Sequence, residues 1–172
     1  LIIFLLAVWY FFTNRSSYNL NDTIRFEGFG EVNALRILSN GKVLVFGTDG
    51  DLFADLSKTN AMVLSVEKES SLQTAIIGLG NVLDICQAGQ TLFLLNRVIT
   101  EPPEVAPDVL RTFEIFESDL SASTWKKIHT FDNASDSSLN YLLCHNDLVM
   151  AVGWDSVWKK SGDAWQKMKR PL

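Results

Sequence analysis

The chain is poor in the residues that bind metals or build disulfide frameworks. Its 172 residues include two cysteines and two histidines. Cys86 and Cys144 each lie in an apolar, strand-like run, and two cysteines do not make a disulfide framework, so we expect two buried free thiols. His129 and His145 have no second ligand at metal-binding spacing. The sequence therefore predicts neither a metal site nor a cofactor.

An excess of basic charge is also missing. Lys and Arg number 15 against 20 Asp and Glu, which gives a net charge of −5. A protein that binds nucleic acid usually carries clustered Lys and Arg, because these residues neutralise phosphates. The few short basic clusters are interpreted as solvated strand faces, and no nucleic-acid partner is expected.

No apolar run reaches the roughly 20 residues that a membrane-spanning helix needs. The longest run, residues 1–12, reads LIIFLLAVWYFF and has about the length of the hydrophobic part of a signal peptide. Because no small-x-small cleavage site follows, we expect a truncated, uncleaved signal-anchor or transmembrane segment that forms a hydrophobic helix. A tether and first strand follow over residues 13–30. The alternative for residues 1–12 is a buried first strand of the fold.

Helical periodicity is hard to find after residue 13, and short apolar or alternating runs bounded by turn residues dominate instead. Asn40-Gly41 supplies the positive φ angles of a tight hairpin turn. Gly89 stands in a corresponding turn 48 residues later. This repeat indicates similar β-units in succession. The segment 101–108 carries three prolines and is an insertion rather than a central strand.

We predict three units of four strands each, over residues 31–80, 81–135 and 136–172. The predicted strands are 34–38, 42–46, 51–56 and 61–66, then 82–86, 91–99, 111–117 and 124–131, then 139–144, 148–153, 155–160 and 164–168. A period of this size is typical of propeller blades. We therefore expect an all-β fold, a partial β-propeller of about three antiparallel blades preceded by the hydrophobic helix, in a chain that is a fragment. A β-sandwich is the alternative, because it has the same alternation and turn spacing.

The turn between the third and fourth strands of the second unit carries a more specific pattern. Residues 118–125 read SDLSASTW and resemble the Asp-box repeat of bacterial neuraminidases, Ser-x-Asp-x-Gly-x-Thr-Trp. Ser118, Thr124 and Trp125 match in position, Asp119 lies one place early, and Ala122 stands where glycine is usual.

A shortened version of the same pattern occurs in the third unit, with Ser161, Asp163 and Trp165. The resemblance to Asp-box, sialidase-like propeller proteins implies that these residues are structural. In such repeats the Ser and Asp brace a hairpin, and the Trp packs between sheets, away from the catalytic face.

No motif for catalysis accompanies this pattern. The arginines lie in no recognisable cluster, and no Gly-x-Ser-x-Gly elbow occurs. We therefore predict a non-catalytic extracytoplasmic module for binding or assembly, tethered to a membrane through its first residues. It is membrane-anchored or secreted, periplasmic or extracellular, and its partner is a protein or a glycan. Trp154 and Asp155, in a turn, are the candidate binding loop.

Two alternatives stay open. The first is a sialidase-like glycoside hydrolase whose catalytic residues lie mostly outside this fragment. The second is a structural, adhesin-like sandwich.

Overall fold

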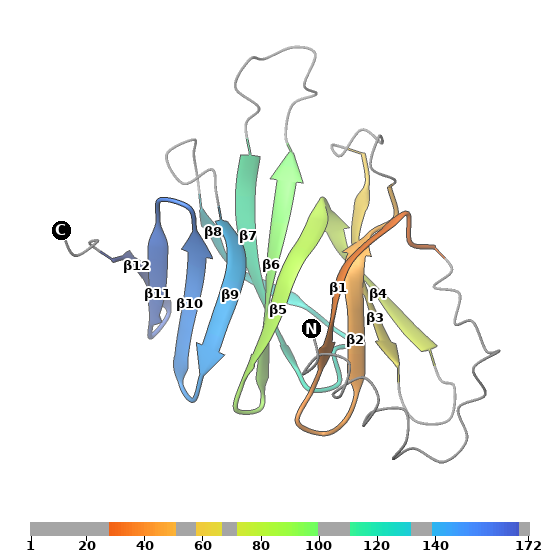
Figure 1. Ribbon diagram of the computed structural model, residues 1–172, viewed down its shortest axis with the longest axis horizontal. Coiled ribbons are helices and arrows are strands. Elements are labelled where there is room, and N and C mark those ends of the chain that lie inside the picture. Colours follow the sequence, from red (N-terminus) through yellow and green to blue (C-terminus); the bar gives the residue numbers. More distant parts are fainter. Residues whose placement is uncertain (1–27, 51–57, 67–71, 100–110, 132–138, 169–172) are drawn as a thin grey trace, which may run out of the picture.

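The computed structural model describes residues 28–50, 58–66, 72–99, 111–131 and 139–168. These residues form three four-stranded antiparallel sheets, each a meander in chain order (Figure 1). Sheet A contains β1 (Glu31–Ile37), β2 (Val43–Thr48), β3 (Asn60–Val66) and β4 (Leu72–Leu79). Sheet B contains β5 (Asn81–Ala88), β6 (Thr91–Ile99), β7 (Arg111–Asp119) and β8 (Lys126–Phe131). Sheet C contains β9 (Leu139–His145), β10 (Leu148–Gly153), β11 (Val157–Ser161) and β12 (Ala164–Lys167). The predicted all-β class is confirmed.

The eight strands predicted for the second and third units are found as sheets B and C, with ends shifted by a few residues. Sheet A differs from the prediction. Its fourth strand is β4, which the sequence did not predict, so residues 61–66 belong to the third strand instead. The predicted strand at 51–56 lies outside the described residues. β4 was missed because it is an edge strand with five of its eight residues exposed, so its apolar residues follow no regular alternation.

The hairpin turns have the backbone geometry that their residues predict. Gly41 and Gly89 adopt φ angles of 83° and 59°, in the left-handed region that glycine enters without steric cost. Asn146 takes the same place in the first hairpin of sheet C, with a φ of 51°. Asparagine tolerates this region better than most residues do. The local sequence therefore decides where each first strand turns back.

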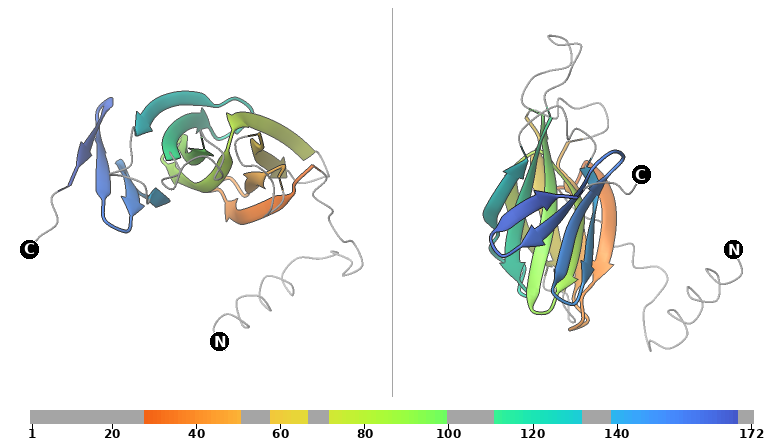
Figure 2. Two further views of the ribbon diagram at one scale, coloured as in Figure 1. Left: turned by 90° about the horizontal axis from the view of Figure 1, so that it is seen from above. Right: turned by 90° about the vertical axis from the view of Figure 1, so that its left-hand side faces the viewer.

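Sheet B lies between the other two sheets, and each of its faces is covered (Figure 2). The cluster between sheets A and B is mainly aliphatic: Leu38, Leu44, Phe46, Ala61, Val63, Val82, Ile85, Leu92, Leu94, Phe116 and Ala122. The cluster between sheets B and C is richer in aromatic residues: Phe93, Leu95, Phe113, Ile115, Phe131, Leu139, Leu142, Val149, Ala151 and Trp165. A β-sandwich needs two facing sheets, whereas the described residues form three sheets in series.

Several sequence predictions fall on other parts of the chain. The anchor at residues 1–12, most of the tether at 13–30 and the insertion at 101–108 lie outside the described residues. Among the residues that the structure does describe, no helix has the length and apolar character needed to cross a membrane.

Candidate functional site

The first strands of the three sheets lie next to one another and form a shallow groove of about 290 Å³, here called the inner groove. β5 lies between β1 and β9 (Figure 1). Three consecutive residues of each segment line it: Arg36 and Ile37 of β1 with Leu38 directly after the strand, Ile85, Cys86 and Gln87 of β5, and Leu142, Leu143 and Cys144 of β9. All three sheets therefore meet along the inner groove.

Asp84 on β5 ties the three sheets together beside the inner groove. Its Oδ1 accepts a hydrogen bond from Nη2 of Arg36 on β1 at 2.7 Å, and its Oδ2 accepts one from the backbone N–H of Leu142 on β9 at 2.9 Å. Oδ1 also accepts a bond from the backbone N–H of Ile85. The Asp84 side chain is 4% exposed, whereas that of Arg36 is 49% exposed. A buried carboxylate is tolerated when it is paired and hydrogen-bonded in this way.

Further hydrogen bonds join β1 to β5 on either side of this ion pair. The amide of Asn33 donates to Oδ1 of Asn81 at 2.6 Å. Near the hairpin turns, the backbone N–H of Ser39 donates to Oε1 of Gln87 at 2.9 Å, and Nε2 of Gln87 donates back to the Ser39 hydroxyl at 2.6 Å. Sheets A and B are therefore held together along their first strands by polar side chains.

Cys86 and Cys144 form a disulfide between β5 and β9. The prediction of two free thiols is therefore wrong. The two cysteines are 58 residues apart in the sequence. The sequence pattern predicts which strands pair within a sheet, but it does not show that the first strands of successive sheets become neighbours. One feature of the sequence could have indicated this disulfide: both cysteines lie near the end of the first strand of their unit. Both side chains are half-buried and line the inner groove.

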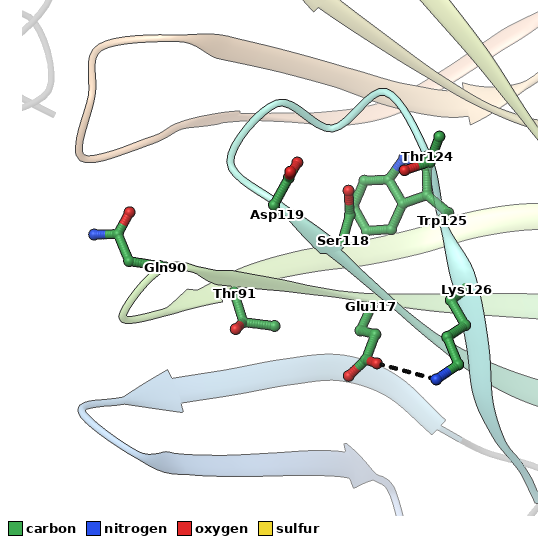
Figure 3. A pocket seen from close by; sticks show the side chains of 8 residues that line it. All are labelled: Gln90, Thr91, Glu117, Ser118, Asp119, Thr124, Trp125 and Lys126. Atoms are coloured by element: carbon green, nitrogen blue, oxygen red, sulfur yellow. Dashed lines mark ion pairs between the residues drawn. The ribbon is translucent and has the colours of Figure 1, made fainter.

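A second depression, of about 440 Å³, lies at the turn between β7 and β8 (Figure 3). Its lining residues come from this turn and from the β5–β6 hairpin: Gln90, Thr91, Glu117, Ser118, Asp119, Thr124, Trp125 and Lys126. Glu117 and Lys126 face one another across it at 3.9 Å, but Lys126 is largely solvated, so this exposed pair contributes little to stability. The depression coincides with the predicted Asp-box-like pattern.

Asp119 organises this turn through hydrogen bonds to its own neighbours. Its carboxylate accepts bonds from the hydroxyl and the backbone N–H of Ser121, and its backbone carbonyl accepts one from the N–H of Ala122 at 3.1 Å. The Ser121 hydroxyl, then the Ser121 N–H, lower the pKa of Asp119 below its ordinary value of 3.8 because they stabilise the charged form. Ala122, at the place where the Asp-box has glycine, has a φ of 55°.

The two tryptophans of the Asp-box-like patterns are placed against the cores. Trp125 is half-buried against the cluster between sheets A and B, and its Nε1 donates to the carbonyl of Ala122 at 3.1 Å. Trp165 is buried in the cluster between sheets B and C. Ser118 is buried, and Ser161 and Asp163 are exposed at the β11–β12 turn.

Trp154 and Asp155, the candidate binding loop, form the turn between β10 and β11. Trp154 is 83% exposed. In a meander, this turn lies at the opposite end of the sheet from the β9–β10 and β11–β12 turns. The structure therefore does not bring the candidate binding loop together with the Asp-box-like turns.

Sequence reasoning missed the exposed apolar side chains on β1 and β9, the first strands of the first and last sheets. On β1, Leu35 and Ile37 are 58% and 51% exposed. On β9, Tyr141 and Leu143 are 63% and 52% exposed. These residues alternate with inward-facing neighbours, so the sequence pattern alone does not show that they are exposed. Only the order in which the sheets stack shows that no sheet among the described residues covers them.

In the part of the chain that the structure describes, no group of three or more His, Cys, Asp or Glu side chains is placed to hold a metal ion.

Comparison with protein families found no family model that matches the chain, and comparison with curated proteins found no similar sequence.

Proposed function

We propose that the protein is a non-catalytic extracytoplasmic module for binding or assembly, in which the three sheets are successive blades of a β-propeller-like series. The observation that carries this proposal is the set of exposed apolar side chains on the first strands of sheets A and C, namely Leu35 and Ile37 on β1 and Tyr141 and Leu143 on β9. Exposed apolar patches of this kind mark surfaces for interaction with other proteins. The gathering of the three first strands along the inner groove supports the propeller-like arrangement.

Two features support a location outside the cytoplasm. A disulfide such as Cys86–Cys144 is compatible with an oxidising compartment, because cytosolic thiols are normally kept reduced. The apolar residues 1–12 have the length and composition of a signal-anchor segment, so the module is proposed to be tethered to a membrane.

The proposed partner is a protein rather than a glycan. Glycan sites usually combine aromatic faces with polar groups, whereas Leu35, Ile37 and Leu143 offer aliphatic surface without hydrogen-bond donors or acceptors. Protein interfaces have apolar cores of this kind, and Tyr141 and Trp154 are residue types enriched at their energetic centres.

Site-specific photo-crosslinking tests this function. p-Benzoylphenylalanine is placed at Tyr141, at Trp154 and, as a control, at the exposed Asp163 of the β11–β12 turn, and each variant is irradiated in its native membrane. We expect discrete protein adducts from Tyr141 and none from Asp163, and adducts from Trp154 if the candidate binding loop takes part. Absence of adducts at every position, or hydrolysis of glycans by the purified chain, would contradict the proposal.

A further inference from the structure

Each described sheet ends in a last strand at a free edge, and the three last strands differ in charge. β4 reads LQTAIIGL and carries no charged residue. β8 begins with Lys126 and Lys127, and β12 ends with Lys167. Lysines on an edge strand discourage pairing with another strand, whereas a long, uncharged and apolar edge favours it. β4 therefore lacks the protection that the last strands of sheets B and C carry.

The free edge of β4 is accessible to another strand. β4 pairs with β3 on one side, and no strand among the described residues pairs with it on the other. Five of its eight residues are exposed, and among them Leu72 is 53% and Ile76 is 68% exposed. Unpaired N–H and C=O groups at such an edge are a template for a further strand. Sheet A can therefore be extended at β4.

The side chains of β4 alternate between the two faces of sheet A. Ala75 stands opposite Val63, which packs in the cluster between sheets A and B, so Ala75 faces sheet B. Leu72, Thr74 and Ile76 face the other way, because successive side chains of a strand alternate between its faces. All three are exposed.

An occupant joins sheet A at this edge and not on its face. Met62 and Leu64 of β3 lie opposite Ile76 and Thr74 and share their face, yet they are only 7% and 4% exposed. The face is therefore already covered at β3. What stays open beside β3 is the edge strand, with its backbone groups and its exposed side chains.

The regular part of β4 is symmetric about Thr74. The register with β3 shifts after Ile76, where β4 has one extra residue, so the regular alternation covers residues 72–76. When a second copy pairs antiparallel with Thr74 opposite itself, Leu72 of each copy lies opposite Ile76 of the other. Opposed residues are then an even number of positions apart, so the free N–H and C=O groups of the two strands face one another. This register also sets large exposed apolar side chains against each other on one face.

We infer that β4 pairs with β4 of a second copy of this chain, in antiparallel register across a two-fold axis at Thr74. A two-fold contact sets a strand against its own copy, so a charged strand would bring like charges together. The absence of charge from β4 removes this repulsion, and Thr opposite Thr is a favourable cross-strand pair. The contact joins two four-stranded sheets into one continuous sheet. The inference goes beyond the proposed function and does not rest on it, because the side chains that carry that proposal lie on β1 and β9.

Disulfide trapping tests the position of the axis. The variant Thr74→Cys is purified as the full chain in mild detergent and oxidised, and its new thiol is free to react because Cys86 and Cys144 are bonded to each other. We expect most of the protein to run as a covalent dimer on a non-reducing gel and as a monomer after reduction. The matched control is Gln73→Cys, at a position that is also exposed. In this register residue 73 lies opposite residue 75, so the two new thiols of the control are too far apart to bond. Equal trapping in both variants, or trapping in neither, overturns the inference.

The oligomeric state supplies the second measurement. Light scattering of the unmodified chain over a series of concentrations should show the protein mass rising towards twice the 19.3 kDa of one chain. Thr74→Lys, which gives β4 the residue type found on β8 and β12, should keep the mass of one chain and retain the β-sheet circular dichroism. Tyr141→Lys, which alters the surface of the proposed function, should dimerise as the unmodified chain does.

Three results of this measurement overturn the inference: a monomeric unmodified chain, a dimer that persists in Thr74→Lys, or a dimer that is lost in Tyr141→Lys. None of them decides the proposed function, because photo-crosslinking at Tyr141 tests that function separately.

Discussion

The two interfaces between neighbouring sheets, here called joints, are stabilised by different kinds of contact. Sheets A and B are joined by polar side chains of their first strands and by an aliphatic cluster, with the ion pair of Arg36 and Asp84 at 2.7 Å. Sheets B and C are joined by a disulfide and by an aromatic cluster in which Phe131 lies 5.5 Å from Trp165, ring centre to ring centre. The same stacking arrangement is thus stabilised by hydrogen bonds at one joint and by a covalent link at the other.

This difference shows that the stacking geometry does not depend on one kind of contact. A specific contact fixes the position of each first strand along its neighbour, and either a charge-assisted hydrogen bond or a disulfide provides this contact. Asp84 is the exception, because it takes part in both joints through Arg36 on one side and Leu142 on the other. A substitution can therefore weaken one joint alone or both joints together.

Removal of the disulfide has the largest expected effect. In the variant Cys86→Ala with Cys144→Ala, we expect the free energy of unfolding to fall by about 4 kcal/mol, because the bond closes a long loop in the unfolded chain. The residues concerned are 58 apart. Hydrogen exchange should show loss of protection in β9–β12 while β1–β8 keep theirs. Equal loss in all three sheets would show that the disulfide stabilises the three sheets together and not the joint between sheets B and C in particular.

Asp84→Ala comes next and should weaken both joints. It leaves the Leu142 N–H without its acceptor and Arg36 with only the bond from its Nε to the Ile85 carbonyl. We expect a loss of about 3 kcal/mol in the free energy of unfolding, because the carboxylate is buried and multiply hydrogen-bonded. Chemical denaturation measures this loss. The control is Lys127→Met, which removes a 2.9 Å ion pair to Glu114 within sheet B. Since Lys127 is about half exposed, its loss should cost no more than about 1 kcal/mol. Similar losses in both variants would refute the role of Asp84 as the common link.

The smallest expected effect concerns the exposed carboxylate of Asp119 in the β7–β8 turn. Because hydrogen bonds from Ser121 lower the pKa of Asp119 below 3.8, the ionised carboxylate stabilises the turn above that pH. This stabilisation is lost as the pH falls through the lowered pKa of the folded state. In the variant Ser121→Ala, we expect the pKa of Asp119 to rise towards 3.8. An NMR titration of the carboxyl carbon measures it, and an unchanged pKa would show that the Ser121 hydroxyl is not the main cause.

The predictions from the sequence succeeded where a strand carries its own pattern. The strands of sheets B and C were predictable because short apolar runs alternate with turn residues such as Gly89 and Asn146. β4 was not predictable in the same way, since an edge strand with one solvated face needs no regular apolar pattern. Of the candidate site, the Asp-box-like turn was visible in the sequence, because its residues contact one another over a few positions.

The sequence alone determined the class of fold and the positions of most turns, because alternation of apolar side chains and positive φ angles are local properties of the chain. Only the tertiary structure decided which strands became neighbours across the sheets. The contact of β5 with β1 and β9 converted two cysteines in separate strands into a disulfide, and it buried Asp84 among donors from all three sheets. The same stacking left Leu35 and Tyr141 uncovered among the described residues, because exposure depends on what packs above a face and not on the residues within it.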